Sequence, residues 1–144
     1  MFSTAHRSIS AYANVGIESG VDGADPHTLV LMLYDGALLA IADARYHMAQ
    51  KNIAAKGQSI SKAIMIIESG LKISLDIKAG GELGVRLAAL YDYMCDRLLR
   101  ANLHNSTEIL EEVSRLLSDL RGAWAQIKPE TSAEAGSGSA NIRA

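Results

Sequence analysis

The sequence predicts an all-α protein, an antiparallel four-helix bundle, and three observations point to this fold class. Apolar residues recur at helical spacing along most of the chain. The chain has no sustained alternation of apolar and polar residues and no Asn-Gly or Asp-Gly turn between such runs, which are the usual signals of strands and hairpins. Short breaks divide the periodic region into four segments, and long helices joined by short breaks fold back on one another.

The first two helices are predicted over residues 26–50 and 53–77. The first begins at Asp25-Pro26, because Asp is a good N-cap acceptor and proline at the first helical position loses no hydrogen bond. The second stops before Ala79-Gly80-Gly81, whose glycines permit the left-handed backbone that ends helices.

The third and fourth helices are predicted over residues 82–103 and 106–127. In the break between them Asn105 can accept from a first-turn N–H, and Glu108 can reach back as in a capping box. Pro129 follows the fourth helix and prevents its continuation.

The 144 residues fit one domain with two appended segments. Residues 25–128 form the predicted bundle. Residues 1–24 form a short N-terminal segment packing loosely on it, and residues 129–144 form a disordered Gly/Ser/Ala tail with too little apolar surface to pack.

Composition excludes several classes of function. The net charge of −2 argues against a nucleic-acid partner, which normally requires an excess of Lys and Arg. A single cysteine, Cys95, cannot form an internal disulfide. We find neither a signal peptide nor the roughly 20 uncharged residues of a membrane span, and therefore expect no membrane insertion and a cytoplasmic location.

No catalytic or metal-binding constellation is recognisable, so we expect no enzyme, no metal and no cofactor. The di-iron bundles need Glu-x-x-His pairs, which are missing here. Cys95 has no apparent neighbouring base. A histidine phosphotransfer module remains an alternative, with His47 near the end of the first helix as its only plausible carrier.

The predicted helices differ in how many apolar faces they carry. The fourth has one such face, whereas the first is apolar nearly all round, and the second and third have a core stripe and a further stripe on another side. The core stripes are Ile60, Ile64, Ile67, Leu71 and Leu75 in the second helix, and Leu83, Leu87, Leu90, Met94 and Leu98 in the third. The single apolar face of the fourth comprises Ile109, Val113, Leu116, Leu117, Leu120, Ala123, Trp124 and Ile127.

The additional apolar residues of the first three helices are candidates for a partner-binding groove. An amphipathic partner helix is bound by anchors at helical spacing. Two alternatives stay open: a wider core or cover by the N-terminal segment, and self-association across a dimer. The predicted binding residues are Leu31, Leu38, Ile66, Gly70, Ile73, Ile77, Val85, Ala89 and Leu99.

Five strings in the bundle region also resemble a known family. They are Leu-Met-Leu-Tyr-Asp-Gly-Ala at 31–37, Ile-Ser-Leu-Asp at 73–76 before Gly-Gly-Glu-Leu at 80–83, Leu-Tyr-Asp-Tyr-Met at 90–94, Arg-Leu-Leu-Arg-Ala-Asn at 97–102 and Ala-Trp at 123–124. In this order and spacing they are similar to FliS, the flagellin-specific export chaperones, and the resemblance extends over about residues 11–127. The family's four-helix bundle agrees with the periodicity.

The resemblance implies a non-enzymatic cytosolic chaperone of flagellar type III secretion. Such a protein binds the disordered C-terminal region of flagellin, prevents premature polymerisation and keeps flagellin competent for export. It also implies a flagellar export gate component as a partner, with a co-chaperone or regulator as a further candidate. By the same resemblance Ile9, Tyr12 and Val15 belong to a lid or gate-docking segment. Whether the tyrosines at matching positions stabilise the bundle or contact the client stays open; they are Tyr34, Tyr91 and Tyr93.

Overall fold

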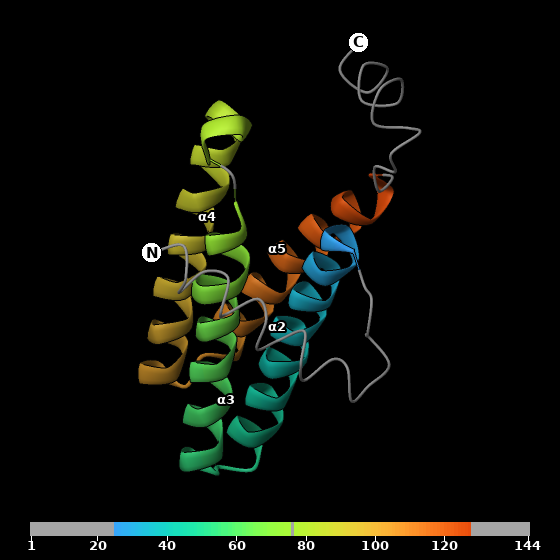
Figure 1. The fold of residues 1–144 in the computed structure, drawn as a ribbon. Helices are drawn as coiled ribbons and strands as arrows, with labels where there is room; N and C mark the ends of the chain where they lie inside the picture. The colour runs from blue at the N-terminus through green and yellow to red at the C-terminus, as the bar shows by residue number, and fades with distance from the viewer. Residues whose placement is uncertain (1–24, 76, 128–144) are drawn as a thin grey trace.

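The computed structural model describes residues 25–75 and 77–127, and for residues 77–79 it describes the backbone. Within this part of the chain every regular element is helical, as predicted. The elements are α2 (Pro26–Ala49), α3 (Ile53–Met65), η1 (Ile66–Lys72), α4 (Ile77–His104) and α5 (Thr107–Gln126) (Figure 1).

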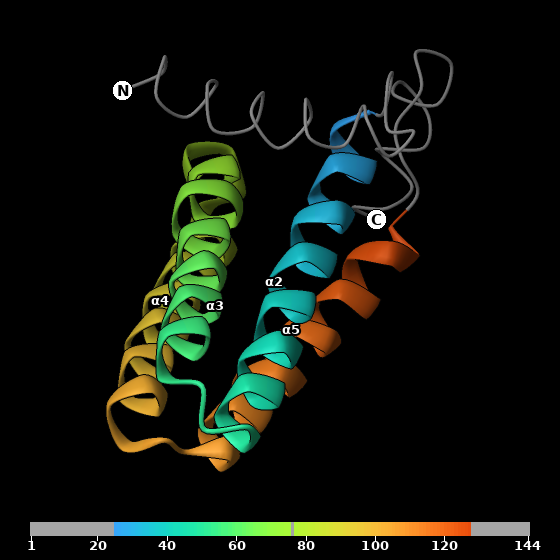
Figure 2. The same ribbon diagram turned by 90° about the horizontal axis from the view of Figure 1, so that it is seen from below.

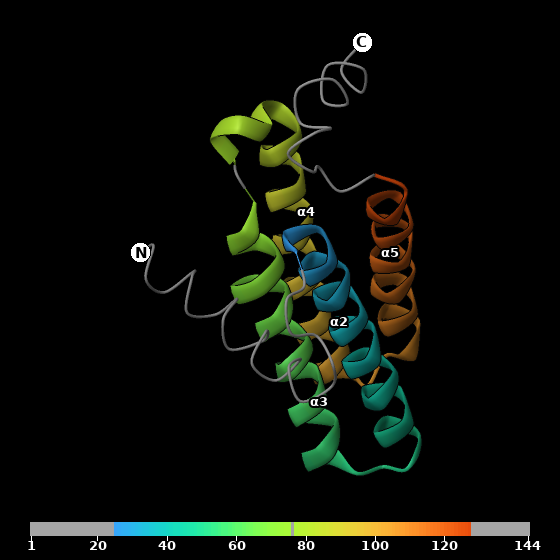
Figure 3. The same cartoon turned by 45° about the vertical axis from the view of Figure 1, so that its right-hand side comes forward.

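The helices form the predicted antiparallel four-helix bundle. α2 contacts α3 and α5, and α4 contacts the same two helices, so the contact between α2 and α5 closes the bundle. Figures 2 and 3 show α3 beside α4 and α2 beside α5, with the N-terminal turn of α2 and the C-terminal turn of α5 at the same end.

Local capping groups fix where the first two helices begin. Asp25 Oδ1 accepts from Thr28 N at 2.8 Å, and Pro26 occupies the first turn, which confirms the predicted start of α2. Asn52 caps α3 in the same way through Ala55 N at 3.1 Å. The side-chain acceptors satisfy N–H groups that lack a partner within the helix.

The cap of α5 is one residue later than predicted. Ser106 Oγ, and not Asn105, accepts from Ile109 N at 3.2 Å. Asn105 instead adopts a left-handed backbone with φ of 53°, which asparagine tolerates better than most residues. Its Oδ1 accepts from Lys56 Nζ, so its side chain joins the α4–α5 turn to α3.

The second predicted helix is not a regular α-helix throughout, because α3 passes at Ile66 into the π-helix η1. Bonds from residue i to i+5 put more residues into each turn. Ile66 and Gly70 are therefore buried together with Ile67 and Leu71. Ile66 lies against α2, where a methyl group on Gly36 would stand 3.4 Å from Ile66 Cδ1. The prediction that Ile66 and Gly70 lie on a surface is wrong.

The turn between η1 and α4 also starts earlier than predicted. η1 ends at Lys72, and Ser74 Oγ donates to Gly70 O at 2.5 Å, which occupies a carbonyl of the last turn. α4 begins at Ile77 but is interrupted at Gly81, whose φ of 57° and ψ of −132° suit glycine alone. The predicted glycine break is confirmed at Gly81, whereas a second helix reaching residue 77 is not found.

The core fills the space between the four helices. Alanines on α2 and α3 let these two helices approach closely, and larger side chains come from η1, α4 and α5. The buried apolar residues are Leu33, Tyr34, Ala37, Ala40, Ile41, Ala44, Ile60, Ala63, Ile66, Ile67, Leu71, Tyr91, Met94, Leu98, Ala101, Leu110, Val113 and Leu117.

Some residues of the predicted apolar faces are exposed instead. Leu83, assigned to the core stripe of the third helix, is 65% exposed, because it follows Gly81, where the backbone is not helical. Ala123 and Ile127 are exposed at the end of α5. Trp124 contacts His27 in the first turn of α2, so the residues of α5 that follow Trp124 extend past the start of α2 and have no part of that helix to pack against.

Two polar contacts join α2 to other helices, one in the core and one at the N-terminal end of α2. The buried hydroxyls of Tyr34 and Tyr91 are 2.6 Å apart. His27 and Trp124 exchange side-chain to backbone hydrogen bonds of 2.8 and 2.9 Å, and their rings stack. These contacts assign Tyr34 and Tyr91 to the bundle.

α2 is also the one helix in the described part with the length and hydropathy of a membrane span, but its apolar side chains contribute to this core.

Candidate functional site

α4 carries a row of apolar side chains on the side away from the core. The exposed fractions are 56% for Val85, 58% for Leu99 and 76% for Leu103. Their separations are close to whole numbers of helical turns of about 3.6 residues, so the three share one face of α4. A helix face that meets only solvent is normally charged or polar. This face is therefore the first candidate for a partner-binding surface.

Two acidic residues, Asp92 and Asp96, lie on the same face between Val85 and Leu99, and each forms an ion pair. Asp92 accepts from Lys72 Nζ at 2.6 Å, and Asp96 accepts from Arg100 Nε at 3.0 Å. The hydrogen bond to Asp92 raises the pKa of Lys72. With both carboxylates paired, the outer side of α4 presents apolar side chains among groups that have no net charge.

A shallow groove of about 690 Å³ lies beside this face, along α3. Small side chains form its floor at Ala54, Gly57 and Ser61, and no atom comes within 4 Å of a methyl group placed on Gly57. The exposed side chains of Ile53 and Met65 stand along the same side of α3, and Asn102 contributes the α4 wall. Helix-in-groove binding needs an elongated apolar surface of this kind.

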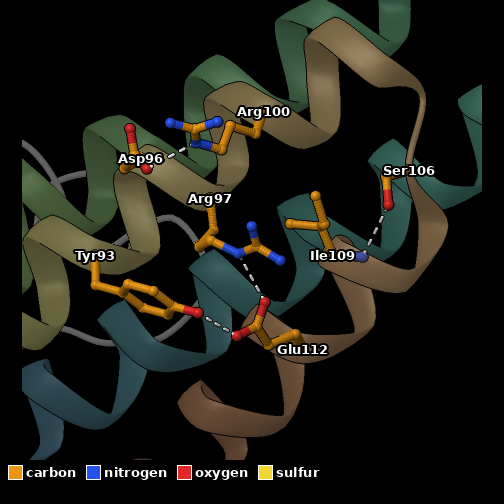
Figure 4. A network of polar contacts seen from close by, with 7 residues as sticks. All are labelled: Tyr93, Asp96, Arg97, Arg100, Ser106, Ile109 and Glu112. Carbon is orange, nitrogen blue, oxygen red and sulfur yellow. Dashed lines mark hydrogen bonds and ion pairs between the residues drawn. The ribbon is translucent and has the colours of Figure 1, made fainter.

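The other edge of α4, where it meets α5, is closed by polar side chains (Figure 4). Glu112 accepts from Tyr93 OH at 2.5 Å and from Arg97 Nε at 2.9 Å. The bond from Tyr93, followed by that from Arg97, lowers the pKa of Glu112, and the bond to Glu112 raises the pKa of Tyr93. These donors and acceptors are satisfied within the protein, which makes this edge a poorer candidate than the α3–α4 side.

The binding residues predicted on the third helix are accessible. Val85, Ala89 and Leu99 are exposed on α4, and Ile73, just beyond η1, is also exposed. Ile77 belongs to the residues whose side chains lie outside the described part, and the same holds for the whole of Ile9, Tyr12 and Val15.

The binding residues predicted on the first two helices fit the surface less well. Leu31 and Leu38 are half-buried, and Leu38 packs against the core. Ile66 and Gly70 are buried through the π-helical turn of η1. The structure therefore favours α4 and the outer side of α3, and not α2, as the accessible surface.

Three residues of this surface were absent from the predicted binding set: Ile53, Met65 and Leu103. The spacing of Ile53, Gly57, Ser61 and Met65 at every fourth position was visible in the sequence. Successive members of this series are neighbours on the surface of α3, but only the placement of α4 beside α3 shows that Asn102 lines the same groove.

Titratable side chains do not form a reactive cluster in the part of the chain that the structure describes, and no group of three metal-binding residues occurs there. Burial raises the pKa of the Cys95 thiol to about 11, so the nucleophilic thiolate is disfavoured at neutral pH. His47 lies half-buried in the last turn of α2 against the ring of Tyr46, and not at an exposed mid-helix position.

Comparisons with known proteins assign the chain to a family. The family model described as "Flagellar protein FliS" matches residues 8–131. The flagellar secretion chaperone FliS of Salmonella typhimurium is 51% identical over 124 residues, which cover 86% of this chain and 92% of that protein. The protein of the same name from Escherichia coli is 46% identical over 85% of this chain and 90% of its own, and that of Bacillus subtilis is 35% identical over 84% and 90%.

Proposed function

The chain belongs to the FliS family of flagellar proteins, and from this membership we propose that it is a cytosolic export chaperone for flagellin. The export-chaperone role follows from the family. In the finer proposal, the protein binds the disordered C-terminal region of newly made flagellin, prevents premature polymerisation and keeps the subunit competent for flagellar type III secretion.

The observation that carries the proposal is the exposed apolar face of α4 beside the groove on α3. Leu99 and Leu103 are more than half exposed although the fold does not need them there. Large exposed apolar patches mark interaction sites in soluble proteins. A disordered apolar client segment that folds into helices on binding is the kind of partner that such a surface accommodates.

The energetics favour an extended apolar contact. A disordered segment that folds on binding loses conformational entropy equivalent to about 2–5 kcal/mol or more. Burial of apolar surface contributes about 25 cal/mol per Å², so the client must cover a long strip of the bundle to bind tightly. The α3 groove with the outer side of α4 supplies such a strip, and reversible apolar contact allows release at export.

The N-terminal segment completes the proposed cycle. Ile9, Tyr12 and Val15 are proposed to cover part of the client surface in the free protein and to take part in docking to an export gate component. A co-chaperone or regulator that shares the surface is a further candidate partner.

A calorimetric titration tests the proposal, with a peptide of about the last forty residues of the same organism's flagellin. Saturable binding with a negative heat-capacity change is expected, because that change marks apolar burial. The double variant Leu99→Glu with Leu103→Glu is expected to weaken binding at least about tenfold, since each glutamate would be desolvated by the client.

The matched control places the same two charges on α5, as Ser118→Glu with Ala125→Glu. Both positions are exposed, so this variant is expected to bind like the unaltered protein. Circular dichroism and thermal unfolding should be unchanged for both variants, because none of the four side chains is in the core. Unaltered binding by the α4 variant would refute the proposed surface.

Self-association is the second candidate function, since the same exposed α4 face could meet its copy across a dimer. Sedimentation that shows a monomer at micromolar concentration would exclude it. Phosphotransfer through His47 is less favoured, because the ring is half-buried near the end of α2. Incubation with a phosphodonor that leaves His47 unlabelled would dispose of that alternative.

A further inference from the structure

A pocket of about 470 Å³ lies at the end of the bundle where the α2–α3 turn and the α4–α5 turn come together. Its size falls in the range of about 300–1,000 Å³ that is usual for ligand sites. Three basic residues, His47, Lys51 and Lys56, belong to its lining, and no acidic residue does. The pocket therefore favours an anionic group.

Lys56 is the most unusual of the three, because it is only 5% exposed. Its Nζ donates to Asn102 O at 3.0 Å and to Asn105 Oδ1, and both acceptors are neutral. None of the ion pairs among the described residues includes Lys56. An ammonium group has three N–H donors, so a third is available for an anion.

The backbone at the pocket also offers donors in preference to acceptors. Ile53 and Thr107, which begin α3 and α5, line the pocket, and the first N–H groups of a helix have no partner within it. Two other helices end here, and several carbonyls of their last turns are already occupied. In α2, for example, Met48 O accepts from Lys51 N, and in α4 Ala101 O accepts from Ser106 N.

The basic pocket adjoins the apolar groove. Ile53 lines both, and Lys56 of the pocket donates to Asn102, which lines the groove. From Ile53 to Met65 the groove follows α3 for about 18 Å at about 1.5 Å per residue, room for roughly three turns of a partner helix. Such a helix would thus meet three basic residues at the Ile53 end of the groove and a single lysine, Lys62, near its Met65 end.

We propose that this pocket binds the C-terminal carboxylate of the client. The inference rests on the proposed function, because it takes flagellin's C-terminal region as the occupant of the groove. The carboxyl end of a helix carries partial negative charge, and a terminal carboxylate adds to it. The last client helix therefore lies antiparallel to α3, with its carboxyl end at Ile53 and its apolar residues facing Met65 and Leu99.

Calorimetry with two synthetic peptides of the flagellin C-terminal region tests this polarity. One peptide ends in a free carboxylate and the other in an amide. The free acid is expected to bind the full-length protein about fivefold more tightly, through charge-assisted hydrogen bonds to the pocket. Without the pocket the two peptides would bind with equal affinity, or the amide would bind more tightly, because a terminal carboxylate weakens the end of a helix.

Variants of the lysines assign the effect to the pocket. Lys51→Asn with Lys56→Met should bring the affinity ratio of the two peptides close to one, whereas Lys62→Gln, which neutralises a lysine of the groove, should keep the ratio. If the loss of Lys56 unfolds the protein, Lys51→Asn alone should lower the ratio about twofold, since Lys51 is exposed and asparagine suits its φ of 59°.

Three results would contradict the inference. Equal affinity of the two peptides, or a preference for the amide, overturns the polarity and leaves the proposed function intact. A preference that persists in the folded lysine variants overturns the assignment to this pocket. Binding of neither peptide overturns the proposed function together with the inference.

Discussion

α4 and α5 are neighbours in the bundle, and they differ in what they show to solvent. Their inner faces are alike: α4 buries Met94 and Leu98, and α5 buries Val113 and Leu117. The outer face of α5 is polar, with exposed side chains such as Ser118, whereas that of α4 carries exposed leucines and a valine.

This difference separates what the fold requires from what function adds. Either helix would be held in the bundle by its inner face, because burial of apolar surface there drives folding. The outer leucines of α4 contribute little to that, and they make the surface prone to association. Because apolar side chains occupy the outer face of α4 and not that of α5, we infer that a partner covers α4.

The largest effects are expected inside, where the two helices should behave the same. Leu98→Ala on α4 and Leu117→Ala on α5 each remove a fully buried side chain. Each is expected to lower the free energy of unfolding by about 2–5 kcal/mol, from lost burial and the cavity left behind. Urea denaturation followed by circular dichroism measures this. A loss under about 1 kcal/mol for only one of them would show that the inner faces are not equivalent.

A polar link in the core, which joins α4 and not α5 to α2, should give the next largest effect. Tyr34→Phe or Tyr91→Phe leaves one buried hydroxyl without its partner and should cost about 1–3 kcal/mol of unfolding free energy. The double variant should lose less than the sum of the two, because no hydroxyl then remains unsatisfied. Additive losses in the thermodynamic cycle would mean that the two hydroxyls do not depend on each other.

The same pair predicts a pH dependence. Burial raises the pKa of Tyr34 and of Tyr91, and the hydrogen bond between them raises that of Tyr91 further. In the unfolded chain tyrosines ionise at about pH 10, so above this pH the unfolded state loses protons that the folded state retains. Stability from the pair is thus complete below pH 10 and falls above it. Denaturation between pH 9 and 11 should show a smaller fall in the double phenylalanine variant.

The sequence predicted most of the fold because the signals involved are local. Asp25 and Pro26 mark the start of α2 whatever the rest of the chain does, and Gly81 interrupts α4 where a left-handed residue was expected. The single apolar face of α5 indicated Val113 and Leu117 as core residues in the same way. Helical periodicity and capping act within a few residues, so they can be recognised without tertiary contacts.

The wrong predictions concern positions whose burial or exposure depends on a tertiary contact. Ile66 enters the core because η1 has a π-helical turn and because α2 offers Gly36 opposite it, neither of which periodicity can indicate. The groove needs Ile53 on α3 and Asn102 on α4 to face the same side, which the periodicity of one helix cannot indicate. Residues outside the described ranges, including the proposed lid, keep their sequence-based assignment as a prediction.

The smallest predicted effect compares a groove position with a matching one on α5. A methyl group added at Gly57 of α3 or at Gly122 of α5 meets no atom within 4 Å. Either alanine should therefore stabilise its helix by about 0.5–1 kcal/mol, seen as a raised urea midpoint. Only Gly57→Ala places that methyl where a client helix would approach, and it should weaken client binding about fivefold, while Gly122→Ala leaves it unchanged. If Gly57→Ala bound the client as well as the unaltered protein, close approach at the α3 groove would be refuted, and the exposed face of α4 would have to account for binding without it.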